Sequence, residues 1–173
     1  IIITKMDFEE SIAVKLEGQD TDIFDDFMEQ FGYYDIFLIH PKGEVFYSVT
    51  HEEDYGTNII DGEYADSGLG KVTREAIDSN DFSFQDFEPY EPSEGAPAAF
   101  IAEPLLHNDE VELVIAMQIA LDEINEFMTA RDGMGATGET YLVGPDHLMR
   151  SDSYLDPENH SVEASFANPE TGS

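Results

Sequence analysis

The sequence predicts an α+β domain, in which helices lie outside the strands of a five-stranded antiparallel sheet. Three observations support this prediction. The order of patterns along the chain is helix, two strands, helix, three strands and helix. Short polar turns join strands one and two, three and four, and four and five, and such short links make the joined strands antiparallel neighbours. The run Val111–Ala120 is apolar on both faces, which is typical of a central strand.

The first elements are a helix and a hairpin. Apolar residues recur at helical spacing from Asp20 to Phe31, and Gly32 ends this helix; a weaker helical candidate precedes it at residues 6–16. The segment Tyr33–Thr50 then has two apolar and aromatic runs around a Pro-Lys-Gly turn. This pattern predicts a β-hairpin.

A long polar crossover follows the hairpin. Asp54–Ala65 is irregular, and either Asp66 or Ser67 is expected to cap a helix with its apolar face at Leu69, Val72, Ala76 and Ile77. We expect the crossover and this helix to form a loop-helix flap over one face of the sheet. A sheet face covered in this way is a natural small-molecule pocket.

The remaining strands are expected at Phe82–Tyr90, Ala98–Leu106 and Val111–Ala120. A helix is expected over Leu121–Arg131, with Leu121, Ile124, Phe127 and Met128 on one side and Gly133 as its stop.

A second copy of the first hairpin is indicated near the end of the chain. Asp35–Pro41 aligns with Glu139–Pro145 so that the acid, the aromatic residue, the leucine, the β-branched residue and the proline coincide. A helical pattern precedes both segments. We therefore expect residues 131–173 to be a linker and the first hairpin of a truncated second unit. Glu139–Tyr154 should pack on the first unit or on another chain, and Leu155–Ser173 should be loosely ordered.

The composition limits the classes of partner. The 173 residues include 7 Lys+Arg and 39 Asp+Glu, which gives a net charge of −32. So few cations argue against binding to nucleic acid and to an anionic membrane surface. A solvated acidic surface, adaptation to a salty exterior and local capture of cations all remain open as explanations of the charge. No cysteine is present, so disulfide and thiolate chemistry are excluded.

Motifs for catalysis or cofactors are weak. The five histidines are scattered, and no Gly-x-Ser-x-Gly sequence occurs. The stretch His51–Asp54 lacks the spacing of an EF-hand loop, and Gly133–Gly138 lacks the lysine of a phosphate-binding loop. The loop Asp61–Asp66 has three acids and is the better candidate for Ca²⁺, with a solvated loop or a helix cap as the alternative. We therefore expect no enzyme activity, no cofactor and no metal site.

Three stretches carry a family resemblance: "YDIFLIHPKGEVFYSVTHEEDYGTNI", "DFEPYEPSEGAPAAFIAEPL" and "GATGETYLVGPDHLMRSDS". They resemble the extracytoplasmic double Cache (PAS-like, PDC) sensor domains of bacterial methyl-accepting chemotaxis receptors, histidine kinases and nucleotide cyclases. The resemblance covers roughly residues 20–154. It implies an N-terminal helical segment at 1–32, a membrane-distal Cache/PAS-like sensor unit at 33–130, and the start of a second unit at 131–173.

The resemblance implies a function as a sensor. The chain would bind a small molecule of unknown class on the periplasmic or extracellular side of the membrane. Ligand binding would bias a rearrangement of helices, transmitted through transmembrane helices outside this sequence. A chemoreceptor is the first reading; the alternatives are a histidine kinase or nucleotide cyclase receptor, or a ligand-free dimerisation module. The N-terminal helix would form a homodimer.

By fold analogy the ligand would contact the sheet and the flap. The expected ligand-binding residues are Tyr47, Tyr55, Tyr64, Arg74, Asp86, Phe100 and Gln118. The sequence departs from the amino-acid-binding members of the family in two ways. It lacks their Arg-x-Trp-Tyr stretch, and Gln118 stands where they have an aspartate that receives the ligand ammonium. The ligand class therefore stays open.

Overall fold

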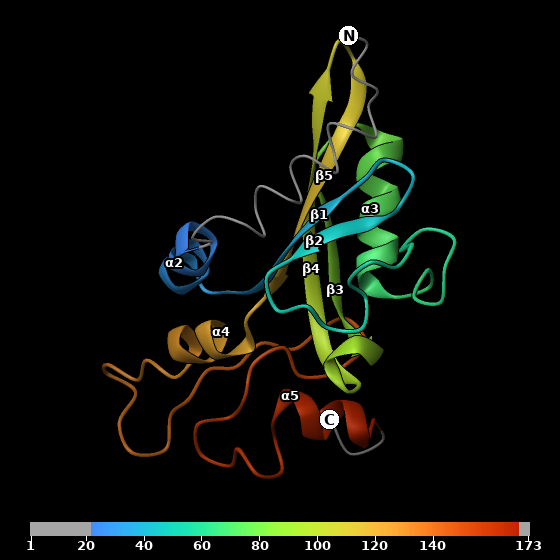
Figure 1. The fold of residues 1–173 in the computed structure, drawn as a ribbon. Coiled ribbons are helices and arrows are strands. Elements are labelled where there is room, and N and C mark those ends of the chain that lie inside the picture. Colours follow the sequence, from blue (N-terminus) through green and yellow to red (C-terminus); the bar gives the residue numbers. More distant parts are fainter. Residues whose placement is uncertain (1–21, 170–173) are drawn as a thin grey trace, which may run out of the picture.

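The computed structural model describes residues 22–169 and shows a five-stranded antiparallel sheet with the strand order β2-β1-β5-β4-β3 (Figure 1). The strands are β1 (Tyr33–Ile39), β2 (Val45–Ser48), β3 (Ser83–Tyr90), β4 (Ala96–His107) and β5 (Glu110–Ile119). The predicted α+β class, the number of strands and the central place of β5 are confirmed. The helical candidate at residues 6–16 lies outside the described residues.

The first helix, α2 (Asp22–Phe31), ends where the sequence predicts. The Gly32 amide donates to the carbonyl of Met28 at 2.8 Å, and its positive φ of 69° turns the chain directly into β1. Such a left-handed conformation is inexpensive only for glycine. The chain then forms the β1–β2 hairpin around the turn at residues 40–43.

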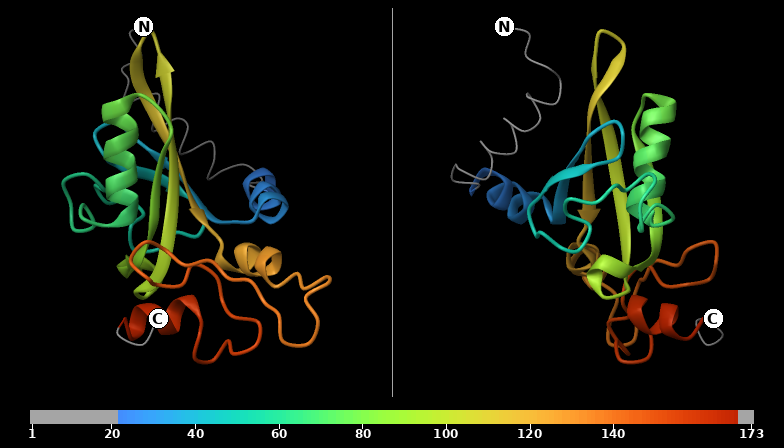
Figure 2. Two further views of the ribbon diagram at one scale, coloured as in Figure 1. Left: turned by 180° about the vertical axis from the view of Figure 1, so that it is seen from behind. Right: turned by 45° about the vertical axis from the view of Figure 1, so that its right-hand side comes forward.

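The flap contains helix α3 (Gly68–Ser79), which packs on one face of the sheet (Figure 2). Ser67 is its N-cap, and the Ser67 hydroxyl accepts a hydrogen bond from the Gly70 amide at 3.3 Å. The main core lies between α3 and the sheet. Its fully buried side chains include Phe37, Ile59, Leu69, Val72, Tyr90 and Phe100.

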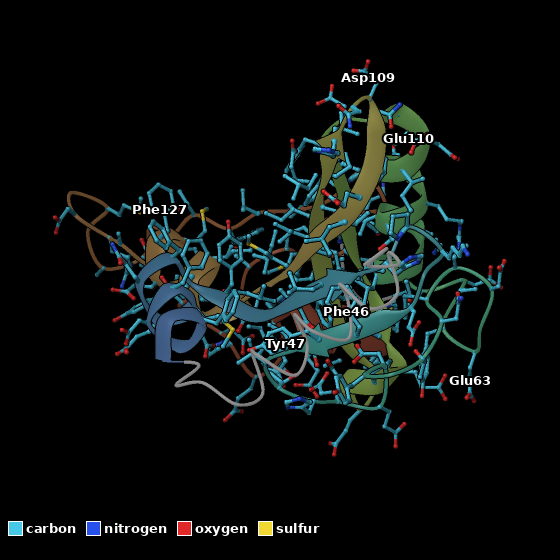
Figure 3. The ribbon with its side chains drawn as sticks, turned by 45° about the horizontal axis from the view of Figure 1, so that its top comes forward. Phe46, Tyr47, Glu63, Asp109, Glu110 and Phe127 are labelled. Carbon is cyan, nitrogen blue, oxygen red and sulfur yellow. The ribbon has the colours of Figure 1, made fainter. Side chains whose placement is uncertain are left out.

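Beyond the third strand, a 3₁₀ turn η1 (Glu91–Ser93) connects β3 to β4. The long β4–β5 hairpin extends past the other strands, and the labelled Asp109 and Glu110 lie at its tip (Figure 3).

Helix α4 (Leu121–Met128) is shorter than predicted. It ends at Met128 rather than running to Arg131 with Gly133 as its stop. The Thr129 amide and hydroxyl both bond the carbonyl of Asn125, which closes the last turn. Phe127 was predicted to lie on the apolar side of this helix, but its side chain is 80% exposed (Figure 3).

The segment after α4 packs on the opposite face of the sheet from α3. Met149 and Val162 are buried against Phe87 of β3 and Ala99 of β4. Residues 142–150 reverse direction through a tight turn with one β-bridge between Val143 and Met149. The expected packing on the first unit is confirmed, whereas the assignment of this segment to a second unit stays a prediction.

The expected loose order after Leu155 was wrong for the described residues. Helix α5 (Val162–Ala167) forms there, and the hydroxyl of its N-cap Ser161 accepts a bond from the Ala164 amide at 3.1 Å. The buried Ser165 hydroxyl accepts a second bond, from the amide of Met149. Side-chain caps of this kind were not visible in the hydrophobic pattern that guided the prediction.

Candidate functional site

A cleft of about 960 Å³ opens at one end of the sheet, between the loop after β2, η1, α4 and α5. Its wall includes Tyr34 of β1, Gln118 of β5 and Ser93 of η1, together with His51 and Glu52 of the loop after β2. The cleft is of the size that small-molecule sites commonly have.

A chain of hydrogen bonds runs along the wall of the cleft. The Tyr34 hydroxyl donates to Glu52 Oε1 at 2.8 Å, and the Ser93 hydroxyl donates to Glu52 Oε2 at 2.7 Å. Gln118 Nε2 donates to Ser93 Oγ at 3.4 Å. The bond to the Glu52 carboxylate raises the pKa of Tyr34 to about 12. The phenol therefore keeps its proton and holds Glu52 in place near neutral pH.

This chain fixes the orientation of the Gln118 carboxamide. Ser93 has one hydroxyl hydrogen, which it gives to Glu52, so Ser93 can only accept from Gln118. The amide nitrogen of Gln118 must therefore face Ser93. Gln118 Oε1 has no hydrogen-bond partner among the described residues, and the residue is only 6% exposed. This oxygen has almost no accessible surface, so it is a buried acceptor without a donor, which costs free energy.

Asp35 anchors the loop that carries Glu52. This fully buried residue of β1 accepts hydrogen bonds from the amides of Ile36, Val49 and Thr50 and from the Thr50 hydroxyl. Burial raises the pKa of Asp35, although these donors act in the opposite direction. The result is a rigid start to the loop at Thr50, two residues before Glu52.

A second buried acid lies in the same loop. Asp54 is fully buried and accepts a hydrogen bond from the hydroxyl of Tyr90, while its Oδ1 has no partner among the described residues. Burial raises the pKa of Asp54 to about 6, and the nearby charges of Asp35 and Glu52 add to the effect. The Tyr90 pKa is also raised, first by burial and then by Asp54.

The cleft is rimmed by acids. Six carboxylate side chains line it: Glu52, Glu53, Glu91, Glu94, Asp122 and Glu163. Among the residues that the structure describes, no lysine or arginine lines it. Four cations bond elsewhere: Lys71 to Glu88, Arg74 to the carbonyl of Ala65, Arg131 to those of Gly135 and Gly138, and Arg150 to Asp86. The field in the cleft is therefore negative.

Gln118 is the one predicted site residue in the wall of this cleft, within the described part of the chain. Two other predicted residues, Tyr47 and Tyr55, lie behind the wall of the cleft. Their rings contact the ring of the wall residue His51 at centroid distances of 6.4 and 4.5 Å. Tyr47 is itself buried in β2 (Figure 3). These tyrosines support the wall residue His51.

The other predicted residues lie in the core or in structural contacts. Phe100 is fully buried between Phe37 and Tyr90, and Tyr64 is buried with its hydroxyl bonded to Glu53 at 3.3 Å. The Arg74 guanidinium donates to the Ala65 carbonyl at 2.6 Å, which holds the flap loop against α3.

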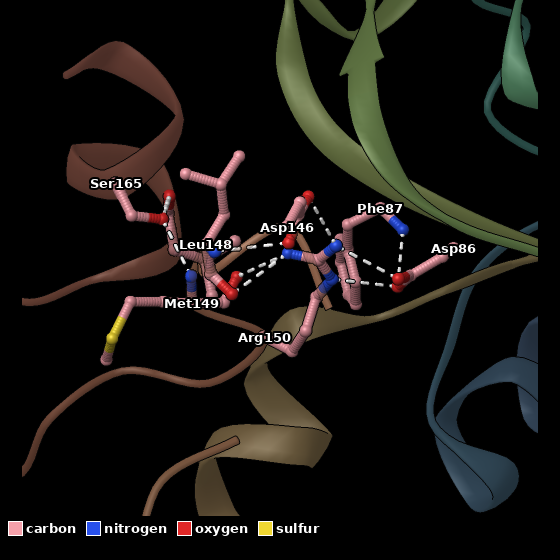
Figure 4. A network of polar contacts seen from close by, with 8 residues as sticks. Asp86, Phe87, Asp146, Leu148, Met149, Arg150 and Ser165 are labelled. Atoms are coloured by element: carbon pink, nitrogen blue, oxygen red, sulfur yellow. Dashed lines mark hydrogen bonds and ion pairs between the residues drawn. The ribbon is translucent and has the colours of Figure 1, made fainter. Parts of the chain in front are cut away.

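Asp86, the last predicted residue, forms an ion pair with Arg150 (Figure 4). The guanidinium also bonds Asp146, at 2.8 Å, and lies 5.3 Å from the centre of the Phe166 ring. Bonding to Arg150 lowers the pKa of Asp86 and of Asp146. This cluster ties β3 to the segment that carries Glu163 into the cleft.

Sequence reasoning missed Tyr34, Ser93 and Glu163 as wall residues. Tyr34 and Ser93 lie within stretches that carry the family resemblance, but no contact role was expected of them, and Glu163 lies outside those stretches. Glu52 was considered within His51–Asp54, but as part of a metal candidate. Within residues 22–169, no three acidic or histidine side chains converge in a geometry that holds a metal ion.

Comparisons with known proteins agree on the fold. No protein-family model matches the sequence, and no curated protein is matched by sequence similarity. Among solved structures, the chain is similar to the ligand-binding domain of the Pseudomonas aeruginosa amino acid chemoreceptor PctB in complex with L-Gln. The TM-score is 0.53 at 16% identity, with 94% of this chain and 59% of that chain covered.

Two further structures are similar. One is the sensor domain of the V. cholerae histidine kinase DctB, with a TM-score of 0.52, 18% identity, and coverage of 92% of this chain and 59% of that chain. The other is an extracellular ligand binding receptor from Desulfohalobium retbaense, with a TM-score of 0.56, 12% identity, and coverage of 95% and 31%. The chain thus spans about three fifths or less of these three proteins. The predicted fold is confirmed, since it matches the fold of these ligand-binding and sensor domains.

Proposed function

We propose that this chain is the extracytoplasmic small-molecule-sensing domain of a transmembrane chemoreceptor, and that the ligand binds in the acidic cleft. The observation that carries the proposal is the cleft itself. It has the size of a small-molecule site, and the hydrogen bonds that join Tyr34, Glu52, Ser93 and Gln118 hold polar side chains along its wall. The matched structures are ligand-binding or sensor domains, which agrees with sensing and not with chemistry on the ligand.

The position of the cleft suggests how binding leads to a signal. Its wall includes Leu121 and Asp122 of α4 and Glu163 of α5, whereas Gln118 belongs to the sheet. A ligand that contacts the sheet and the helices at the same time favours the positions of α4 and α5 in which the two sets of contacts form together. The shift in population is limited by the difference in ligand affinity between the two packings.

Of the seven ligand-binding residues predicted from the sequence, we propose that Gln118 contacts the ligand directly. Tyr47 and Tyr55 would act through His51, and Arg74, Tyr64 and Phe100 would hold the flap and the core behind the cleft. Asp86 would act through Arg150, which positions the segment that carries Glu163.

The same sensor domain on a histidine kinase is the second candidate, which the similarity to the DctB sensor domain favours. Both candidates place the chain outside the cytoplasm and require a membrane anchor. No helix in residues 22–169 is long and apolar enough to cross a membrane.

A thermal-shift screen of the whole 173-residue chain tests the proposal. Organic acids, amino acids, amines and divalent ions are compared at one ionic strength. Because a ligand that binds only the folded state stabilises it by mass action, one compound class should raise the melting temperature by several degrees. Gln118→Leu should abolish this shift, while Glu110→Gln, which changes an exposed residue at the tip of the β4–β5 hairpin, should leave it unchanged (Figure 3). A flat response across all four classes would contradict the proposal.

A further inference from the structure

Side-chain hydrogen bonds join two sides of the cleft. One side is the loop after β2 (residues 49–57), and the other is η1, which directly follows Tyr90 at the end of β3. Glu52 of the loop bonds Ser93 in the wall of the cleft, and Asp54 bonds Tyr90 in the protein interior. We propose that the Asp54–Tyr90 contact is a proton-dependent latch, which holds the loop on the sheet more tightly when Asp54 is neutral than when it is ionised.

The two buried acids of this region differ in the number of donors around them. Asp35 accepts hydrogen bonds from three amides and from the Thr50 hydroxyl, which suits an ionised carboxylate. Asp54 accepts from the Tyr90 hydroxyl at one oxygen, whereas its buried Oδ1 has no partner among the described residues. Burying a carboxylate with one oxygen unpaired is costly, and the neutral acid needs fewer donors. The packing around Asp54 therefore favours its neutral form.

The charges around Asp54 favour the neutral form as well. Asp35 of β1 and Glu52 of the same loop are both acids and oppose a further negative charge on Asp54. The phenol of Tyr90 in β3 is the titratable group in direct contact, and its pKa is raised by burial and by Asp54, so it keeps its proton. None of the ion pairs between described residues includes Asp54. These effects agree with the raised pKa of Asp54, about 6, although the bond from Tyr90 acts in the opposite direction.

Ionisation of Asp54 would act on the loop as a whole. Backbone bonds hold the loop on β2, since the Gly56 amide donates to the Val45 carbonyl and the Val45 amide donates to the Thr57 carbonyl, both at 2.9 Å. Because Asp54 is fully buried beside these bonds, water reaches its carboxylate only if the loop moves away from the core. The closed loop holds the proton more tightly than an open loop would, so a rising pH favours the open loop.

Opening of the loop would change the cleft. His51, Glu52 and Glu53 belong to the loop and line the cleft, and Glu52 would move away from Ser93. Glu53 is bonded by the Tyr64 hydroxyl of the flap, not by Asp54. The latch is complete below about pH 4 and is lost as the pH rises toward about 6. This control of the cleft by pH rests on the proposed function, whereas the latch itself needs no ligand.

Hydrogen exchange on the whole chain tests the latch without a ligand. Protection factors, from which the intrinsic effect of pH on exchange has been divided out, are compared at about pH 4.5 and about pH 7. The amides of Tyr55, Gly56 and Thr57 are bonded within the loop or to β2, so they report its opening. Their protection should fall at least about fivefold more than that of the β5 amides. A pKa of about 6 for Asp54 against the ordinary 3.8 allows a change of up to about a hundredfold.

Three variants identify the group that titrates. Asp54→Asn retains an acceptor for the Tyr90 hydroxyl and removes the titration, so the protection of the loop should no longer depend on pH. Tyr90→Phe retains the ring and removes the bond, so it should lower this protection at both pH values. His51→Gln is the matched control, since histidine side chains commonly ionise between pH 5 and 8, but the His51 ring contacts Tyr47 and Tyr55. It should retain the full pH dependence. Circular dichroism checks that every variant is folded.

The outcomes are distinguishable. Equal pH dependence in the loop and in β5 of the natural protein would overturn the latch, and this comparison is decisive even where a variant does not fold. An unchanged pH dependence in Asp54→Asn, or its loss in His51→Gln, would also overturn it. A flat thermal-shift screen would remove the sensing function and leave the latch in place, whereas failure of the latch would leave the sensing function in place.

Discussion

Arg150 and Asp86, 64 residues apart in the sequence, form a bidentate ion pair with nitrogen–oxygen distances of 2.8 and 2.9 Å (Figure 4). The Arg150 side chain is 9% exposed and that of Asp86 is 39% exposed. The planar guanidinium matches a carboxylate with two parallel bonds, which gives the pair a fixed geometry. The pair is a polar connection between β3 and the segment that follows α4.

Replacing Arg150 with methionine should lower the free energy of unfolding by about 1–3 kcal/mol, since Asp86 and Asp146 lose their partner but remain partly hydrated. Arg150→Lys should restore only part of this loss because lysine cannot form the bidentate pair. Urea denaturation measures the effect. Lys71→Met, at an ion pair whose lysine is 41% exposed, should cost less than about 1 kcal/mol. Equal losses at the two sites would contradict the central role of Arg150.

Arg150→Met should also loosen the segment that follows α4 more than the rest of the protein. Hydrogen exchange should accelerate at the amides of Met149 and Ser165, which lie in or bond to this segment, while β1 keeps its protection. Uniform acceleration throughout the sheet would show that the segment and the sheet unfold together.

Asp54 should make the protein less stable as the pH rises. Its pKa is about 6 in the folded state, against an ordinary value of 3.8 for an aspartate in water, so the folded protein holds this proton more tightly than the unfolded chain does. The stabilisation from the bound proton is complete below about pH 4 and is lost as the pH rises toward about 6. Asp54→Asn removes this titration and retains an acceptor for the Tyr90 hydroxyl.

The stability of Asp54→Asn relative to the natural protein should therefore increase between about pH 4 and pH 6.5, by about 1–3 kcal/mol. Paired urea denaturation curves across this range measure the difference. Taking the difference cancels the opposite trend from Asp86 and Asp146, whose lowered pKa values make them stabilise the fold as the pH rises. A difference independent of pH would show that Asp54 does not titrate in this window.

Gly68→Ala should destabilise the protein by about 1–3 kcal/mol, even though alanine favours helix formation. A Cβ atom at this position would lie 2.9 Å from Cδ2 of the buried Phe100 ring. Adding Phe100→Leu to Gly68→Ala should cost less than the sum of the two single changes, because the smaller side chain makes room. Thermal denaturation of all four proteins completes the cycle; strict additivity would mean that the two residues do not contact.

The choice of N-cap for α3 has a direct test. Ser67→Ala should lower the free energy of unfolding by about 1 kcal/mol, because the Gly70 amide loses its side-chain acceptor. Asp66→Ala changes the neighbouring exposed acid and should have a much smaller effect. The reverse order of the two effects in urea denaturation would assign the cap to Asp66.

Local patterns predicted the elements well because they follow from neighbouring residues. Gly32 ended α2 where its left-handed conformation was needed, and the apolar run of β5 correctly indicated a central strand. The end of α4 was misplaced: the helix ends at Met128 with Thr129 as its C-cap, before the Gly133 that the sequence offers as a stop.

The candidate site was harder to predict because it depends on contacts between distant residues. Phe100 and Gln118 pair across β4 and β5 in the same sheet, but Phe100 is buried under α3 while Gln118 reaches the cleft. Alternation along a strand identifies the two faces of the sheet; it does not show how far a flap extends over one of them. The bond from Ser93 to Glu52 spans 41 residues and has no sequence signal at all.

The arrangement of β1 beside β5 has a consequence for how this domain fits into a longer polypeptide. Tyr33 pairs with Ile119, and the Ala120 amide donates to the Gly32 carbonyl at 3.3 Å, so the chain enters and leaves the sheet at one point. A unit with adjoining entry and exit can replace a single surface loop of a host protein without forcing the flanking residues apart. Residues 32–120 are therefore connected to the rest of the polypeptide at two neighbouring peptide bonds, while Met149 and Val162 of the following segment still cover one face of their sheet.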